Sequence, residues 1–436
     1  MTTITFWAGL NTIGGNIVEI ATEQVRLFTD FGTTMGVKDH TLRPLNNAYE
    51  EQILHHALPP IPGVFKGSKP EVIALERFEQ KDDRPIIVFI SHLHLDHVGA
   101  LPFITPEAQI YALEETVDLY NTLVKEGLEV SYGASFIPVQ SGETKQFGDL
   151  KVTMHVSDHD TIGAGAIFVE APDVRVIHSG DLRLTGHHPE RVAEWAKKAR
   201  EFEPDFFLIE GTMYSFDLDP TRVGIKTEEE LREVMRKELA EANDKHQMMF
   251  INTYPRNPER LKLFQEVTSE QGRTLVLPAS YRNVLKAFFP LSAEKTVVTS
   301  EEQIQLMHQE PEKYTWLVRF QTDDIAGFEP GTPYVHSNGE PLGAYDPRYQ
   351  VLVDELESKQ YRWVSGGVSG HGLPEELLQV LEWAQPKMVI PWHSFRPEVM
   401  QASFEQAGYR VARPVAQMPY HAKAWLDYLE SDRTRG

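Results

Sequence analysis

Short apolar runs, rich in β-branched residues and separated by polar or glycine-rich turns, dominate the first part of the chain. Such runs are typical of β-strands. On this pattern we predict strands at residues 3–8, 16–21, 24–30, 85–90, 150–156, 166–170 and 174–178, with a helix at 106–126. The N-terminal part is therefore predicted to be rich in β-structure.

The later part of the chain shows the longer period of amphipathic helices. Thr227 and Glu230 have the spacing of a capping box, and Asn257-Pro258 has the residue types that begin helices. The helices predicted there alternate with strands predicted at residues 248–253 and 274–277, which implies a parallel, Rossmann-like α/β unit. The last quarter repeats the alternation, with helices predicted at 374–384 and 397–407 and strands at 387–391 and 409–415.

Composition narrows the class of protein. The 436 residues allow one large domain or two to three smaller ones, and the absence of cysteine excludes disulfides and zinc–thiolate sites. There is no long apolar run and no signal-peptide pattern, so we expect no membrane partner and a cytoplasmic location. The α/β unit has no phosphate-binding glycine signature, so we also expect no nucleotide cofactor. A net charge of −22 opposes non-specific polyanion binding by the surface as a whole, but it does not exclude a local basic groove.

The densest chemical signal is the run from His92 to His97, with the sequence His-Leu-His-Leu-Asp-His. Four of its six side chains are of types that bind metals. The run directly follows the strand predicted at residues 85–90. Imidazole nitrogens and carboxylate oxygens in this density suit zinc or a similar divalent first-row ion. The run therefore predicts a metal site on a loop at the end of a buried strand.

Five further ionisable residues share one arrangement, because each lies close behind an apolar stretch. They are His159, Asp181, Glu210, His371 and His393. Ligand sites in α/β sheets collect at the carboxyl ends of strands, so one shared site explains this repetition better than coincidence. Each residue also has an ordinary alternative. Asp181 and Glu210 could cap a turn or helix, the histidines could be loop residues, and His155 competes with His159 as a ligand.

Taken together, these residues resemble the metallo-β-lactamase superfamily and, within it, the β-CASP nucleic-acid hydrolases. The resemblance covers nearly the whole chain and rests on the ordered set Asp30, His92–His97, His159, Asp181, Glu210, His371 and His393. Glu210-Gly-Thr, Ser-Gly-His371 and Pro-Trp-His393-Ser look like the three β-CASP motifs. Residues 253–260 and 336–341 also look like segments of short ribonuclease J-type RNA-processing nucleases.

The resemblance implies an α/β fold, an αββα metallo-β-lactamase sandwich with an inserted Rossmann-like β-CASP domain. Residues 1–205 and 366–436 would form the sandwich, and residues 206–365 the insert. It also implies two Zn²⁺ ions, with Mn²⁺ as a possible substitute. The first would be held by His92, His94, His159 and Asp181, and the second by Asp96, His97, Asp181 and His393. Asp30 would lie behind these ligands and orient them.

The implied reaction is cleavage of phosphodiester bonds in single-stranded RNA, as an endonuclease or a 5′-exonuclease. Paired metals lower the pKa of a bridging water, and the resulting hydroxide would attack the phosphorus. His371 would be the general acid or a phosphate donor, oriented by Glu210, and Asp96 would join them as a catalytic residue. Ser337 and Arg256 are weaker candidates for contacts with substrate phosphates.

Two departures from the family pattern affect this interpretation. Asp160-Thr161 follows His159, where Ser-Ile-Pro is often found, so the shape of that loop is open. The chain also ends about one helix after His393, whereas ribonuclease J has a further C-terminal domain that helps dimerisation. We therefore leave monomer and homodimer as alternatives.

Three other functions remain open on the sequence. The first is a DNA nuclease of the same architecture. The second is a metallohydrolase of small esters, lactones or phosphodiesters, which the acidity of the chain favours slightly. The third is a non-catalytic partner protein in an RNA-processing assembly, which would have no need of a full set of metal ligands.

Overall fold

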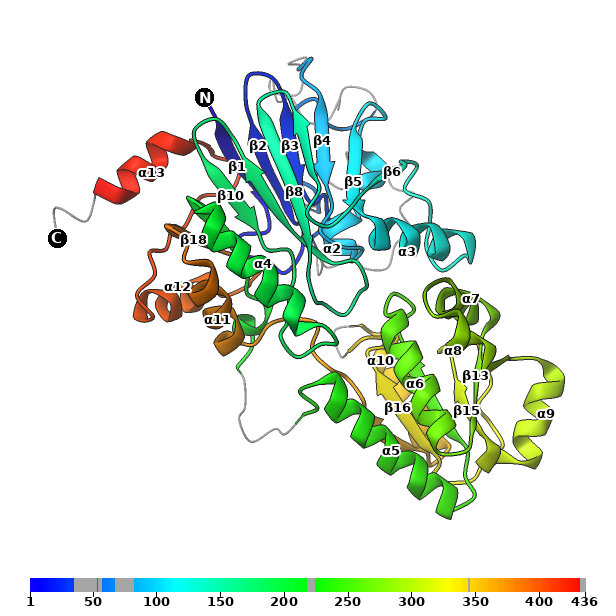
Figure 1. Cartoon of the computed structure of the whole chain (residues 1–436). Coiled ribbons are helices and arrows are strands. Elements are labelled where there is room, and N and C mark those ends of the chain that lie inside the picture. Colours follow the sequence, from blue (N-terminus) through cyan, green and yellow to red (C-terminus); the bar gives the residue numbers. More distant parts are fainter. Residues whose placement is uncertain (35–52, 54–56, 67–81, 218–223, 344–345, 432–436) are drawn as a thin grey trace.

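The computed structural model describes residues 1–34, 53, 57–66, 82–217, 224–343 and 346–431. Two packed β-sheets with helices on their outer faces form one part of the molecule, and a smaller α/β lobe lies beside them (Figure 1). None of the helices in the described ranges is long and apolar enough to cross a membrane.

The first sheet has the strand order β19-β1-β2-β3-β4-β5-β6. Its strands are β1 (Thr3–Ala8), β2 (Ile17–Ala21), β3 (Arg26–Thr29), β4 (Ile86–Phe89), β5 (Gln109–Leu113), β6 (Phe136–Val139) and β19 (Pro419–His421). Strands β3, β4, β5 and β6 run parallel, whereas β1 pairs antiparallel with both of its neighbours. The strands predicted at the N-terminus and at residues 85–90 are therefore confirmed to within two residues.

The second sheet has the order β18-β11-β10-β9-β8-β7. Its strands are β7 (Thr144–Phe147), β8 (Leu150–Val156), β9 (Gly165–Glu170), β10 (Arg175–His178), β11 (Phe206–Glu210) and β18 (Met388–Trp392). Side chains such as Phe6 and Leu27 of the first sheet pack against Val152 and Leu208 of the second in one buried cluster. Apolar burial between the sheets is the main force that holds them together.

Helices cover both outer faces, which completes the predicted αββα sandwich (Figure 1). Helix α3 (Glu114–Lys125) packs on β5 and β6, and α4 (Pro189–Phe202), α11 (Pro374–Ala384) and α12 (Pro397–Gln406) bury their apolar faces on the second sheet. The remaining elements of this part are α2 (Leu95–Val98), η2 (Leu101–Phe103), η3 (Thr212–Ser215) and α13 (Ala422–Ser431).

The α/β lobe contains a third, fully parallel sheet in the order β14-β13-β15-β12-β16-β17. Its strands are β12 (Met249–Thr253), β13 (Thr274–Leu277), β14 (Thr296–Val298), β15 (Tyr314–Leu317), β16 (Pro333–Ser337) and β17 (Arg362–Ser365). Its helices are α5 (Glu228–Asp244), α6 (Pro258–Glu270), α7 (Ala279–Phe288), α8 (Pro290–Glu294), α9 (Glu301–Gln309), η4 (Pro311–Lys313) and α10 (Arg348–Ser358). The predicted caps hold, because Thr227 accepts from the amide of Glu230 and Asn257 from that of Arg260. The parallel strands and the helices between them form the predicted Rossmann-like unit.

Three details differ from the sequence predictions. The helix predicted at residues 106–126 begins only at Glu114, because 109–113 is a buried strand between β4 and β6. The strand predicted at 409–415 is reduced to one bridge, between Val389 and Val411, since Arg413-Pro414 cannot continue a ladder. The predicted division into domains stays a prediction, but strand β11 at the start of the predicted insert lies in the sandwich.

A buried ion cluster joins the lobe to the sandwich. Glu228, at the start of α5, accepts from the guanidinium of Arg260 (Oε1 to Nη2, 2.5 Å) and lies 3.0 Å from Nη1 of Arg183. The three side chains are at most 3% exposed. Burial alone would raise the pKa of Glu228, but Arg260 and Arg183 lower it to about 2. Glu228 therefore lies between two buried cations, and the carboxylate of Asp158 lies 3.8 Å from Nε of Arg183.

We expect Glu228→Gln to lower the free energy of unfolding by about 3–5 kcal/mol, because it removes the carboxylate that is paired with the buried guanidinium of Arg260. Urea unfolding followed by tryptophan fluorescence measures this loss. The pKa of Glu228 is depressed in the folded state, so its contribution is complete above pH 4.5 and disappears as the pH falls towards 2. Glu229→Gln, at the exposed neighbouring position, is the control. An equal loss in both variants would contradict the assignment.

Candidate metal centre

The candidate site lies where parallel strands of both sheets end. Strands β3 and β4 run parallel, so Asp30 and His92 follow them at the same edge of the first sheet. In the second sheet β10, β11 and β18 also run parallel, which brings Asp181, Glu210 and His393 to one edge. Strand order thus explains why residues far apart in the sequence meet here. Asp30 (φ +59°) and His393 (φ +55°) adopt the left-handed conformation directly after their strands, a strained geometry that often occurs at functional sites.

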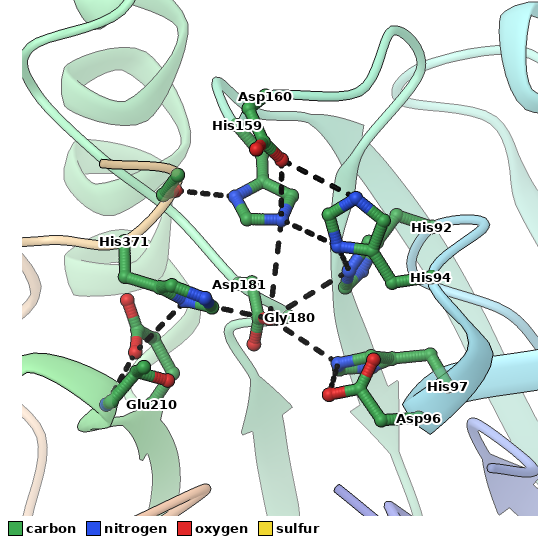
Figure 2. Close-up of polar contacts among 12 residues, drawn as sticks. His92, His94, Asp96, His97, His159, Asp160, Gly180, Asp181, Glu210 and His371 are labelled. Carbon is green, nitrogen blue, oxygen red and sulfur yellow. Dashed lines mark hydrogen bonds and ion pairs between the residues drawn. The ribbon is translucent and has the colours of Figure 1, made fainter. Parts of the chain in front are cut away.

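Three groups of candidate metal-ligand atoms in the described residues share Asp181, and in each group these atoms lie within 4.8 Å of one another. Two of them consist of the predicted ligands, His92, His94, His159 and Asp181 in one and Asp96, His97, Asp181 and His393 in the other. The third consists of Asp181, Glu210, His371 and His393. The seven residues that the sequence predicts as metal ligands therefore come together, and Figure 2 shows His92, His97 and His159 directed at Asp181.

His371 and Glu210 lie on the opposite side of Asp181 from His92, His94 and His97 (Figure 2). Nδ1 of His371 is 3.6 Å from Oδ2 of Asp181 and 3.6 Å from Oε2 of Glu210. The carboxylate of Glu210 is fully buried and accepts from the backbone amides of Thr212 and Gly372, both at 2.9 Å. Burial alone would lower the pKa of His371, but the carboxylates of Glu210 and Asp181 raise it to about 9.

Each of the five clustered imidazoles has a polar partner at the nitrogen that points away from the cluster. The pairs are His92 with Ser91 Oγ (3.0 Å), His97 with Asp30 Oδ2 (2.7 Å), His393 with Thr212 Oγ1 (2.7 Å), His159 with the carbonyl of Gly370, and His94 with Asp160 Oδ1 (3.3 Å). A carbonyl or carboxylate oxygen only accepts, so the imidazole protons of His94, His97 and His159 lie on their outer nitrogens. The two hydroxyl partners donate elsewhere, Ser91 to Oδ2 of Asp30 (2.8 Å) and Thr212 to the carbonyl of His393 (3.5 Å), so each can accept from its imidazole. The inner nitrogens then present their lone pairs to the cluster, as metal ligands require.

The carboxylate of Asp181 differs from these imidazoles, because no hydrogen-bond donor among the described residues contacts it. It is 1% exposed, and neither of its oxygens has a hydrogen-bond partner among the described residues. Four inner imidazole nitrogens surround Oδ2, at 3.2 Å (His97), 3.6 Å (His92), 3.7 Å (His393) and 4.0 Å (His159). A buried carboxylate without donors among imidazole lone pairs is the environment expected for a ligand shared between divalent cations. The residues present thus fit a divalent metal site.

One edge of the cluster is open to solvent. The side chains of His94, Asp96, Asp160 and His371 are 18%, 15%, 16% and 22% exposed, whereas those of His92, His97, His159, Asp181 and His393 are at most 1% exposed. Of the described residues in the cluster, these four have the side chains that a substrate can reach from solvent.

Ser337 and Arg256 are outside the ligand groups, although Arg256 contacts Tyr254, whose ring centroid lies 6.0 Å from that of His94. Ser337 is fully buried, and its hydroxyl donates to the carbonyl of Gly366 (2.7 Å), so it is not available to a phosphate in this conformation. Arg256 is 7% exposed, pairs with Glu129 and donates to the hydroxyl of Tyr254. Neither residue joins the metal-ligand groups, and the predicted substrate contacts stay predictions that this geometry does not support.

Sequence reasoning missed several side chains of the site, among them Ser91, Thr212 and Asp160. Thr212 contacts His393, and Asp160 lies beside His94 and His159. Thr212 is the last residue of the Glu-Gly-Thr motif, so the motif contained a signal for it. The signal for Asp160 was its place directly after a candidate ligand, where the sequence departs from the family pattern.

Comparison with known proteins gives the same family. Residues 60–220 match the family model of the metallo-beta-lactamase superfamily. Ribonuclease J of Pyrococcus abyssi is 22% identical over 77% of this chain and 81% of its own length. Ribonuclease J 2 of Streptococcus pyogenes is 23% identical over 49% of this chain, and RNase aCSPSF2 of Saccharolobus solfataricus is 23% identical over 41%. These two matches cover only 38% and 32% of the relatives' own lengths.

A solved structure shares the fold over nearly the whole chain. It is a crystal structure of a protein of unknown function from Enterococcus faecalis V583, with a TM-score of 0.81 and 26% identity. The similarity covers 96% of this chain and 99% of that one. The resemblance to the metallo-β-lactamase superfamily and to ribonuclease J-type β-CASP proteins is confirmed.

We expect a divalent metal to stabilise the protein through Asp181. Saturation of one site with free Zn²⁺ at 100 times its dissociation constant adds about 2.7 kcal/mol to the free energy of unfolding. Asp181→Asn should remove most of this gain, because both ligand groups contain Asp181. Chemical unfolding of chelator-treated protein, with and without Zn²⁺, measures it. Asp118→Asn, on the exposed face of α3, is the control. An equal Zn²⁺-dependent gain in Asp181→Asn would contradict the shared site.

Proposed function

We propose that this protein is a two-metal hydrolase that cleaves phosphodiester bonds in single-stranded RNA. The observation that carries the proposal is Asp181, a buried carboxylate without hydrogen-bond donors among the described residues, surrounded by inward-facing imidazole nitrogens. The similarity to proteins named ribonuclease J supports RNA as the substrate.

The ligand groups suit two Zn²⁺ ions, with Mn²⁺ as a possible substitute. His92, His94 and His159 with Asp181 would hold one ion, and Asp96, His97 and His393 with Asp181 the other. Two such ions supply an activated water and neutralise charge on the phosphoryl oxygens. Asp30 and Thr212 keep His97 and His393 in the tautomers that bind metal.

His371 would act on the leaving oxygen. It lies at the open edge, across Asp181 from the run of histidines, so a phosphodiester bound between them is in reach of both. Glu210 positions it in two ways, through the approach of Oε2 to Nδ1 and through the hydrogen bond from the amide of Gly372. With Nδ1 directed at the carboxylates, Nε2 is the nitrogen that can reach a substrate oxygen. Proton donation from Nε2 to the leaving group would assist bond cleavage.

Charge limits how the substrate is held. The chain has a net charge of −22, which repels a polyanion over most of the surface, so the positive charge needed for RNA must be local. Divalent ions at the ligand groups and a protonated His371 would supply it. This favours short contacts around the scissile phosphate over a long basic groove. Cytoplasmic location, and a monomer or a homodimer, remain part of the proposal.

The test is cleavage of a 5′-end-labelled single-stranded RNA beside a DNA of the same sequence, with Zn²⁺ or Mn²⁺ supplied. We expect cleavage of RNA, and a product ladder that separates endonuclease from 5′-exonuclease action. His371→Ala should lower the rate about 10²- to 10⁴-fold, the usual contribution of general acid–base catalysis. Its metal content, measured by atomic emission, should stay at two ions per chain, since His371 lies outside the two proposed ligand groups. His421→Ala, at an exposed position in β19, is the control variant and should cleave at the wild-type rate.

Other outcomes point to other functions. Cleavage of both strands would make the protein a general nuclease of the same architecture. Cleavage of neither strand, by protein that contains two metal ions, would overturn the proposal in favour of a small-molecule metallohydrolase, to be tested with bis(p-nitrophenyl) phosphate and lactones.

A further inference from the structure

Asp160 is a carboxylate beside the proposed metal ligands that the function so far does not use. It follows His159 directly, at a position where the family pattern often has serine. Its Oδ1 lies 3.3 Å from Nε2 of His94 and 3.3 Å from Nε2 of His159 (Figure 2). This oxygen is buried and makes no hydrogen bond to the described residues in this structure, so it has a lone pair free to accept from one of the two imidazoles once a metal is bound.

The hydrogen bonds around the two imidazoles decide which of them Asp160 serves. Nδ1 of His159 meets the carbonyl of Gly370, which only accepts, so the proton of this neutral ring is on Nδ1. Nε2 of His159 then has a lone pair and cannot donate to Asp160. Nε2 is also the nitrogen of His159 that lies 4.0 Å from Oδ2 of Asp181, so it is the nitrogen that a metal would bind.

His94 has the reverse orientation. Its Nδ1 faces the cluster, 3.2 Å from Nε2 of His92 and 3.1 Å from Nε2 of His159. Its other nitrogen, Nε2, is the one that approaches Asp160. A proton on Nε2 is therefore directed at an acceptor, and the lone pair of Nδ1 is directed at the ligand group. His94 is also the only imidazole of this group with substantial exposure, so packing alone holds it less firmly than the others.

We propose that Asp160 is a positioning residue for His94, and that it strengthens metal binding at the group of His92, His94, His159 and Asp181. Its carboxylate accepts a hydrogen bond from Nε2 of His94. This bond fixes the orientation of the ring and makes the lone pair of Nδ1 a stronger ligand for a metal. The proposal rests on the metal centre of the proposed function. It concerns one of the two proposed ligand groups, because the ion-pair contacts of Asp160 within the described ranges are with His94 and His159.

The side chains of Asp160 and His159 pack closely against Gly370. A side chain at Gly370 would begin 2.8 Å from Cγ of Asp160 and 2.9 Å from Cε1 of His159, so the loop can pass here only with glycine. The carbonyl of the same glycine fixes His159. One loop therefore positions both Asp160 and His159 against the ligand group.

The test is metal affinity of the full-length protein, measured by competition with a chromophoric Zn²⁺ chelator. We expect Asp160→Asn and Asp160→Ser to weaken one of the two bound equivalents about 10- to 100-fold, the usual effect of losing such a partner. The other equivalent should keep its wild-type affinity. Co²⁺ absorption spectra should change in the same variants, since the geometry at one ion changes. Asp118→Asn, at an exposed position on α3, is the matched control.

The outcomes separate this proposal from the one it rests on. Wild-type affinity for both equivalents in both variants would overturn the role of Asp160. Weakening of both equivalents together with loss of the native circular dichroism spectrum would also overturn it, in favour of a purely structural role. If the wild-type protein binds no metal, both proposals fail. If it binds two ions but cleaves no RNA, the proposed substrate fails while the Asp160 experiment keeps its meaning.

Discussion

Asp181 carries a carboxylate into the interior, where neither oxygen meets a hydrogen-bond donor in the described part of the chain. An uncompensated buried carboxylate costs several kcal/mol, on the order of the net stability of a domain. Imidazoles surround it on one side and His371 lies on the other. Cations bound by those imidazoles would compensate the charge, so stability and chemistry at this position depend on the same ligands.

The sheets, more than the loops, place these groups. Asp30, Asp181, Glu210 and His393 each lie within three residues of a strand end, and parallel pairing carries those ends to one edge. Outside the ligand groups, the oxygens of Ser91, Thr212, Gly370 and two aspartates fix the rings. The site is thus preorganised by backbone register first and by partners of the imidazoles second, and each partner has the acceptor chemistry that its ring requires.

Much of this arrangement was predictable from the sequence, for a physical reason. Apolar runs mark buried strands, and an ionisable residue such as Asp181 behind such a run has few explanations other than a site. The contacts of Ser337 and Arg256 were not predictable, because local motif similarity does not reveal burial. Nor was the strand at residues 109–113, since a short apolar run next to a helix reads as its first turns. Asp160 needed three-dimensional contacts, because its partner His94 is 66 residues away along the chain.

The lobe is tied to the chemistry through Arg183, two residues after Asp181. Its guanidinium lies 3.0 Å from Glu228 at the start of α5 and also donates to the carbonyl of Ser369 (3.0 Å). Ser369 begins the loop that carries Gly370, the partner of His159, and then His371. A displacement of α5 must therefore either break a buried ion pair or move this loop. The ion cluster thus links the position of the lobe to that of His371, the residue proposed to act on the leaving group.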